Sequence, residues 1–277
     1  RFALVGHAAV PFFSRYCWWY ASARWNTAPV VAGSPHPEGR EAVENVNPAD
    51  LGDAVGSLRD SSAAEVDQAI SAAAAYAVQW DKTPAVDRAR MLETTADLME
   101  EDFGELMALC MREAGKTAHD AVSEIREAVD FLRYYAIQAR EYFSHPILLP
   151  GPAGERNELS LHGKGVFACI SPWNFPLAIL TGQVSAAMAA GNAVLAKPAE
   201  QTPAIAAHAV ALMHRAGVPR AALQFLPGDG VSVGARLVAD PRIDGVAFNG
   251  STQTARRINR CLAARDAPLA TLIAETG

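Results

Sequence analysis

One long uncharged stretch dominates the hydrophobic pattern of the chain. It runs from Gly165 to Ala196 and is interrupted only by Pro172, Pro176 and a few polar residues. A membrane helix would need about 20 mostly apolar residues without such breaks. The prolines and a Gly-Asn turn divide it into a strand, a turn, a helix and a second strand over residues 165–170, 171–176, 177–190 and 193–196. Continuous apolar strands are typical of parallel sheets buried on both faces. The stretch therefore predicts a βαβ crossover in the core of an α/β domain.

The chain before this stretch has mainly helical periodicity. Ser62 and Glu65 form a capping-box pattern at the start of the first helix. Apolar residues recur at three- and four-residue steps from Val122 to Leu132, and charged residues, Glu124 among them, are expected on solvated faces with ion pairs. The predicted helices cover residues 62–79, 85–101, 103–114 and 118–143. Residues 27–56 are expected to be an extended connection, residues 146–154 a turn-rich break, and residues 157–162 one strand of a small hairpin.

After the crossover, strands and helices alternate to the end of the sequence. The predicted helices are residues 203–216, 231–238 and 253–264, and the predicted strands are residues 223–226, 245–248 and 269–274. Such alternation gives a parallel, doubly wound sheet with ligands at the carboxyl ends of its strands. The last strand has no following partner in the sequence, so we expect an exposed sheet edge that is prone to aggregation.

Composition narrows the class of protein further. Hydrophobic residues make up 50% of the chain, and the net charge of −6 is spread without a basic stripe, which argues against nucleic acid as a partner. Four separated cysteines without a C-x-x-C pair favour reduced thiols in the cytoplasm. The histidines show no metal-ligand spacing. The sequence begins with Arg1, and Pro11 and Arg15 break the apolar segment that a secretory signal would need, so we expect the cut edge of a longer polypeptide.

Two glycine-rich turns each follow a strand and open a helix. One contains Gly228, Gly230 and Gly234, and the other contains Gly250 followed by Ser251. A helix N-terminus offers free N–H groups to a phosphate, and glycine lets the backbone approach a ligand. Neither turn matches a full nucleotide-binding motif, so each alone could be an ordinary strand-to-helix turn. Together in one sheet they favour nucleotide binding.

Four further polar residues lie at or just after the ends of buried strands. Lys197 and Glu200 could hold the hydroxyls of a ribose, or could form a surface ion pair. Asn174 lies between two aromatic residues and two prolines, where its amide could stabilise an oxyanion or could be satisfied by local backbone. Glu275 ends the last strand, where a partly buried carboxylate could act as a general base or could point to solvent.

Several motifs together resemble the aldehyde dehydrogenase superfamily. They are SPWNFP at 171–176, KPAEQTP at 197–203, FNGST at 248–252 and the terminal IAETG. REAGKT at 112–117, EIREAVDFLRYYA at 124–136 and ERNELSLHGKGV at 155–166 more narrowly resemble the L-glutamate γ-semialdehyde (1-pyrroline-5-carboxylate) dehydrogenase modules of bifunctional bacterial proline-utilisation proteins. The resemblance covers residues 46–277.

The resemblance implies a fold and a domain plan. The fold would be α/β, with a Rossmann-like, doubly wound and mainly parallel sheet that follows a helical segment and stops before the catalytic domain. Residues 1–45 would be an irregular segment and linker, 46–147 the helical part of the cofactor domain, 148–164 an oligomerisation β-flap, and 165–277 the incomplete NAD-binding sheet. The parent protein would be a homo-oligomer without a membrane span, and a proline dehydrogenase domain could precede Arg1.

The resemblance also implies roles for residues of this chain. Asn174 would donate to the oxyanion, and Glu275 would activate the hydrolytic water. Cofactor contacts to NAD would come from Ser171, Trp173, Lys197, Glu200, Gly230, Gly250 and Ser251. The substrate would be an aldehyde, L-glutamate γ-semialdehyde, which is oxidised to L-glutamate. No residue would hold a metal.

Some features depart from the family pattern and leave alternatives open. Asn249 replaces a usual threonine, and the family's nucleophilic cysteine lies beyond the motif in which this sequence ends. The four cysteines present lack the environment of a reactive thiol. We therefore expect the isolated chain to be inactive. The alternatives are a non-catalytic dinucleotide-binding or assembly module, and a dehydrogenase for another aldehyde, including a CoA-acylating enzyme.

Overall fold

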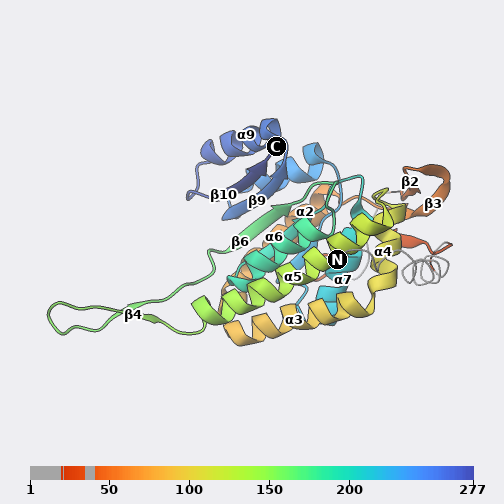
Figure 1. Cartoon of the computed structure of the whole chain (residues 1–277). Coiled ribbons are helices and arrows are strands. Elements are labelled where there is room, and N and C mark those ends of the chain that lie inside the picture. The colour runs from red at the N-terminus through yellow and green to blue at the C-terminus, as the bar shows by residue number, and fades with distance from the viewer. Residues whose placement is uncertain (1–19, 21, 35–40) are drawn as a thin grey trace.

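The computed structural model of the chain describes residue 20, residues 22–34 and residues 41–277. At its centre lies a five-stranded sheet whose neighbouring strands are all parallel (Figure 1). Its strands are β6 (Val166–Ile170), β7 (Ala193–Lys197), β8 (Leu223–Phe225), β9 (Gly245–Gly250) and β10 (Thr271–Thr276). The order β10-β9-β6-β7-β8 means that the chain first builds outward from β6 to β8 and then returns to the other side of β6. The predicted doubly wound parallel sheet is confirmed.

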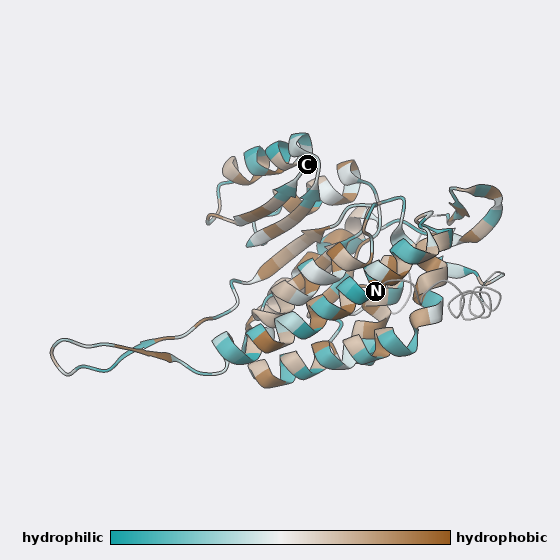
Figure 2. Ribbon diagram, viewed as in Figure 1, coloured by the Kyte–Doolittle hydropathy of each residue, from teal (hydrophilic) through white to brown (hydrophobic). Residues whose placement is uncertain are grey.

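Helices cover both faces of this sheet. One layer contains α3 (Ala85–Glu101), α4 (Phe103–Arg112), α5 (Ala118–Phe143), α6 (Ala178–Ala189) and α7 (Pro203–Arg215), and the other contains α2 (Ala63–Asp81), α8 (Ala235–Ala239) and α9 (Thr252–Ala263). In β6, Phe167 and Cys169 pack into the first layer, whereas Val166 and Ala168 pack into the second. This period of two explains why β6 has no polar face, as its brown colour in Figure 2 shows.

The upstream helices follow the predicted periodicity closely. The capping box is present at the start of α2, where Ser62 Oγ accepts from the Glu65 N–H at 3.2 Å and Glu65 Oε2 accepts from the Ser62 N–H at 2.8 Å. Helix α5 has the predicted bounds. One expectation for its charged residues is wrong, because Glu124 is fully buried. Arg133, in contrast, does form exposed ion pairs, with Asp97 and Glu100.

The extended connection expected over residues 27–56 instead contributes to a small sheet. Strands β1 (Trp25–Thr27), β2 (Val43–Asn47) and β3 (Asp50–Leu58) form it in the order β1-β3-β2. Close approach of β1 requires glycine at position 56, since a Cβ there would lie 1.9 Å from the Trp25 carbonyl oxygen. Sequence patterning missed β1 and β2 because they are short and mostly polar, and it missed the longer β3 because its glycine and aspartate residues are typical of turns.

Residues 147–159 form a hairpin arm that projects away from the body of the molecule (Figure 1). Strand β4 (Ile147–Leu149) pairs antiparallel with β5 (Asn157–Leu159). The strand predicted within residues 157–162 is therefore present as β5, whereas β4 lies within the expected turn-rich break. Leu148 is 69% exposed on this arm. Across the described part of the chain, no helix has both the length and the apolar character that a membrane crossing requires.

Two elements near the carboxyl end differ in detail from the prediction. The helix expected over residues 231–238 begins as one turn of π-helix, η1 (Gly230–Gly234), before α8. The last strand, β10, lies two residues further along the chain than predicted and pairs only with β9 among the described residues. Its outer edge is therefore open, as expected, and Ile273 is 60% exposed there.

Candidate functional site

The candidate site residues follow the carboxyl ends of neighbouring parallel strands. Ile170, at the end of β6, is paired with Lys197 on one side and with Phe248 on the other. Strand order reverses between β6 and β9, and the crevice at such a reversal is where open α/β sheets bind ligands. The structure therefore brings the predicted Ser171, Lys197 and Gly250 regions to one edge of the sheet.

The turn after β6 leaves one buried hydroxyl unpaired. Ser171 is 5% exposed, its N–H donates to the Lys197 carbonyl at 3.2 Å, and its Oγ has no hydrogen-bond partner among the described residues. Asn174, expected to be buried, is exposed, because its neighbours Trp173 and Phe175 also turn outward. Its amide therefore bears no desolvation cost in this chain and is free to reach a ligand.

Lys197 and Glu200 lie where the second buried strand ends. Lys197 is 3% exposed, and its Nζ donates to the Pro198 carbonyl at 2.8 Å and lies 3.8 Å from Glu200 Oε2. Burial lowers the pKa of Lys197, partly offset by the nearby carboxylates of Glu200 and Asp229. The ion pair considered from the sequence is present, but its lysine side is buried while Glu200 is half exposed.

The glycine turn at Gly230 lies beside this lysine. A Cβ on Gly234 would lie 3.9 Å from Lys197 Cε, so the lysine stem passes close to the end of η1. Asp229 caps that turn by accepting from the N–H groups of Val231 and Ser232 at 2.8 and 2.6 Å. A cavity of about 460 Å³ opens between η1, α8 and the start of α2, with Val66 and Val231 among its lining residues. Its lining also includes Ser61, Ser232 and Arg236, so the cavity offers both apolar and polar contacts to a ligand.

The second glycine turn ends β9 and opens α9. Ser251 is the N-cap residue and accepts from the Thr254 N–H at 3.2 Å. A Cβ on Gly250 would lie 2.7 Å from the Phe248 ring, so a larger residue here would require this ring to move. The first N–H groups of α9 therefore face the carboxyl edge of the sheet, where they can bind an anion.

Glu275 lies on the open edge strand rather than in a closed crevice. It is exposed, as in the alternative that it points to solvent, and accepts a hydrogen bond from Asn249 Nδ2 at 2.9 Å. Both residues line a cavity of about 420 Å³ with Gln183 of α6 and Ile273. The exposure follows from the place of β10, because no described element covers its outer side. Asn249, noted as a departure from the family pattern, thus orients this carboxylate.

The three described cysteines do not provide a reactive thiol. Burial raises the pKa of Cys169 to about 12, and it raises that of Cys110 well above its ordinary value. Cys261 is partly buried on α9 and packs against the apolar cluster beneath that helix. A thiolate nucleophile needs a depressed pKa and access. Cys17 lies outside the described residues, as does most of the aromatic segment at the start of the chain.

Sequence reasoning missed two buried carboxylates that contact this site. Glu113 and Glu124 each accept backbone N–H groups at the start of a helix that follows a site loop. The signal for Glu124 was its position between Ala121 and Ala128 on the buried stripe of α5, which a charge count obscures. Glu113 offered no such signal, because its partners lie far along the chain.

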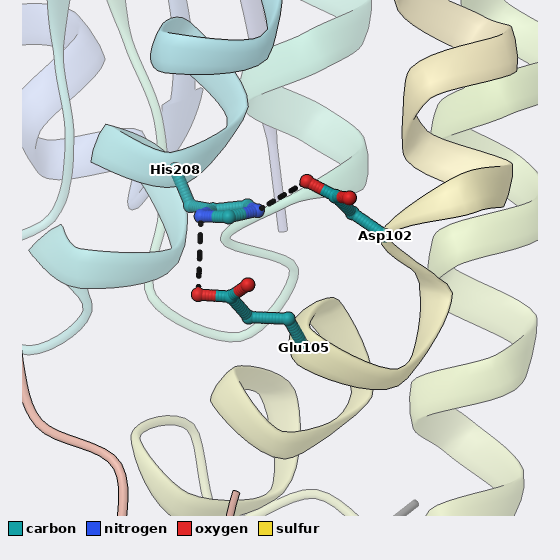
Figure 3. A group of neighbouring side chains, drawn as sticks. All are labelled: Asp102, Glu105 and His208. Atoms are coloured by element: carbon teal, nitrogen blue, oxygen red, sulfur yellow. Dashed lines mark ion pairs between the residues drawn. The ribbon is translucent and has the colours of Figure 1, made fainter.

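A cluster of titratable residues lies on the α4–α7 side of the molecule. Figure 3 shows the His208 ring between Asp102 and Glu105, with nitrogen-to-oxygen distances of 3.5 and 3.7 Å. The carboxylates already accept from protein donors at 2.8 Å, Asp102 from Arg215 and Glu105 from the Trp25 indole. A guanidinium so close opposes a second cation, so this cluster joins α4 to α7 as an ion-pair network.

The fold defines the class of this domain as doubly wound α/β with a parallel sheet. A sequence model of the aldehyde dehydrogenase family matches residues 36–277, and the chain belongs to this family. It is 49% identical over 257 residues to the bifunctional protein PutA of Klebsiella aerogenes, covering 92% of this chain and 18% of PutA. It is 36% identical over 231 residues to 1-pyrroline-5-carboxylate dehydrogenase 2 of Bacillus subtilis, covering 83% of this chain and 44% of that enzyme.

A solved structure supports the same relationship. The 1-pyrroline-5-carboxylate dehydrogenase from Thermus with bound NAD superposes with a TM-score of 0.91 at 33% identity, covering 99% of this chain and 54% of that one. The chain therefore spans about a fifth of the length of PutA and about half of the single-function dehydrogenases. The resemblance drawn from the motifs of this sequence is confirmed.

Proposed function

We propose that this chain is the NAD-binding part of a dehydrogenase that oxidises L-glutamate γ-semialdehyde to L-glutamate in proline catabolism. The observation that carries the proposal is the convergence of buried Lys197, the unpaired Ser171 hydroxyl and the Gly250 turn at one edge of the sheet. Support comes from the relatives, whose names include 1-pyrroline-5-carboxylate dehydrogenase, and from the Thermus structure, whose title includes NAD.

The residues present fit a dinucleotide from end to end. Lys197 and Glu200 would hold the hydroxyls of the adenosine ribose, and the cavity beside Gly230 would take the adenine ring. The N-terminus of α9, with Ser251 and Gly250, would bind the pyrophosphate. Ser171 and Trp173 would line the crevice further along. When bound, NAD supplies the hydride acceptor of the oxidation.

Two side chains of this chain would serve the chemical steps. The exposed Asn174 amide would donate to the oxyanion that develops on the aldehyde oxygen. Glu275, held by Asn249, would take a proton from the water that hydrolyses the thioester. Because the described cysteines are buried, or packed in the case of Cys261, the nucleophilic thiol would come from another part of the parent protein. We therefore propose that the 277-residue chain alone does not catalyse the oxidation.

The hairpin arm exposes apolar residues that could contact another protein chain. Ile147, Leu148, Leu149 and Leu159 are large apolar residues with exposed fractions between 42 and 69%. We propose that this arm packs against another copy of the protein in a homo-oligomer. The match to bifunctional PutA supports fusion of the parent to a proline dehydrogenase domain.

Calorimetric titration with NAD tests the cofactor assignment. We expect saturable heat with the wild-type chain and affinity reduced by at least tenfold in Lys197→Met, which keeps the buried stem but removes the donor. Lys82→Met, a similar loss of charge at an unrelated helix end, is the control. An absence of saturable binding at millimolar NAD would contradict the proposal. An assay for NADH production with the aldehyde should stay at background, and clear turnover would refute the claim that the chain is inactive alone.

A further inference from the structure

The helices that follow the two main site loops lack caps of their own. Helices α2, α5 and α9 are capped by the Ser or Thr that precedes them, namely Ser62, Thr117 and Ser251. At the start of α6 and α7, Leu177 and Thr202 make no side-chain cap bond. The loops before these two helices are residues 171–176, which include Asn174, and residues 198–202, which include Glu200.

Glu113 supplies the missing cap of α7 from the end of α4. Its Oε1 accepts from the Ala204 N–H at 2.7 Å and its Oε2 from the Ile205 N–H at 2.8 Å. Pro203 has no N–H, so these are the first free donors of the helix. Asn45 Nδ2 also donates to Oε1, and Glu113 is 3% exposed. A buried carboxylate with partners this specific fixes where the 198–202 loop ends.

Glu124 does the same for α6. Its Oε1 accepts from the N–H groups of Leu177 and Ala178 at 2.8 and 3.3 Å, and the residue is fully buried. Its Oε2 lies 2.6 Å from Lys116 Nζ, which in turn lies 4.0 Å from the centroid of the Phe175 ring. The lysine thus joins the buried carboxylate to the turn that presents Asn174.

We propose that Glu113, Lys116 and Glu124 are positioning residues, which hold loops 198–202 and 171–176 in their ligand-ready conformations by capping the following helices from a neighbouring segment. Because Glu113 caps α7 from outside, the hydroxyl of the N-cap residue Thr202 has no hydrogen-bond partner among the described residues. In the other loop, the Ser171 hydroxyl likewise has no partner among these residues. The ligand-binding part of this inference rests on the proposed function.

Because the two glutamates contact different loops, their variants should affect the two ends of the dinucleotide differently. Glu113→Gln should weaken ADP-ribose and NAD equally, on the order of tenfold, because loop 198–202 serves the adenosine end that both ligands share. Glu124→Gln should weaken NAD by a similar factor and leave ADP-ribose within about twofold, because loop 171–176 serves the nicotinamide end. Glu93→Gln, which removes a carboxylate paired with Arg140 away from both loops, is the matched control and should change neither.

Hydrogen exchange read by mass spectrometry tests positioning without any ligand. We expect faster exchange over residues 198–205 alone in Glu113→Gln, and over residues 172–178 alone in Glu124→Gln. If Glu124→Gln does not fold, Lys116→Met should show the same change over residues 172–178, because Lys116 contacts both Glu124 and the Phe175 ring of that turn.

Failure of each idea has its own signature. The positioning roles would be overturned if exchange became uniformly faster across the chain, or if it did not become faster at either loop, even if NAD binds. Equal loss of NAD and ADP-ribose affinity in both variants would also overturn them. If the wild-type chain binds neither ligand, the proposed function fails, while the exchange pattern still decides whether the two carboxylates position their loops.

Discussion

Ionisable side chains are buried on both sides of the 198–202 loop, and their protonation states matter at the scale of single residues. Lys197 lies before the loop and Glu113 contacts the helix after it. Burial raises the pKa of Glu113 from 4.5 to about 7. The hydrogen bonds that it accepts from the N–H groups of Ile205 and Ala204 act in the opposite direction and lower this pKa. Its neighbour Cys110 is a thiol whose pKa is also raised by burial, so it stays neutral over this range.

Stability should therefore depend on pH through Glu113. Between pH 4.5 and about 7 the folded chain keeps a proton that the unfolded chain has released, so this contribution is full below pH 4.5 and is lost as pH rises through 7. The loss corresponds to roughly 3 kcal/mol. Urea unfolding of the wild type and of Glu113→Gln from pH 4.5 to 8 measures this loss. Because glutamine does not titrate, the unfolding free energy of the wild type should fall relative to that of the variant as pH rises. A difference that stays constant over this range would contradict the assignment.

At the scale of elements, the start of α2 illustrates how far local sequence rules reach. The Ser62–Glu65 capping box was predicted from its spacing and is present in full. Glu65 additionally forms a buried ion pair with Arg59 at 2.7 Å, which ties the helix start to the chain just after β3. Local sequence thus defines the helix start, and a tertiary contact anchors it.

Replacing Ser62 with Ala should destabilise the chain by about 1 kcal/mol, because the Glu65 N–H loses its acceptor. Ser123→Ala is the control, since this exposed hydroxyl bonds only to the carbonyl of its own helical turn, and its loss should change stability by less than about 0.5 kcal/mol. Chemical denaturation of both variants makes the comparison. Equal effects would show that the cap contributes nothing beyond helix propensity.

At the scale of the whole molecule, the sheet is covered on both faces but open at one edge. Strand β10 pairs with β9 alone among the described residues, and Leu269 and Ile273 are exposed beside it. Such an edge offers unpaired N–H and C=O groups to another chain. The candidate base, Glu275, lies on this same strand.

Charge on the open edge should reduce self-association. We expect Ile273→Lys to lower the aggregation of concentrated chain, measured by light scattering, because a charged edge resists strand pairing. Val78→Lys adds the same charge on an exposed helix face and serves as control. If both variants aggregate alike, net charge rather than the edge governs the behaviour.

The sequence by itself determined the doubly wound, parallel character of the main sheet, the bounds of the long helices and the family, because these depend on local periodicity, caps and contiguous motifs. It did not determine burial at particular residues. Asn174 and Glu275 are exposed although they border apolar segments, and Glu124 is buried although it lies among charges.

Only the tertiary structure decided which distant groups meet. The contacts of Glu113 with Ala204 and of Asn249 with Glu275 join positions that no local pattern links. The same holds for the small sheet of β1, β2 and β3, whose polar strands acquire their pairing from packing beside α7. The physical reason is that burial and hydrogen-bond partners are properties of the packed chain, whereas periodicity and capping are properties of a few adjacent residues.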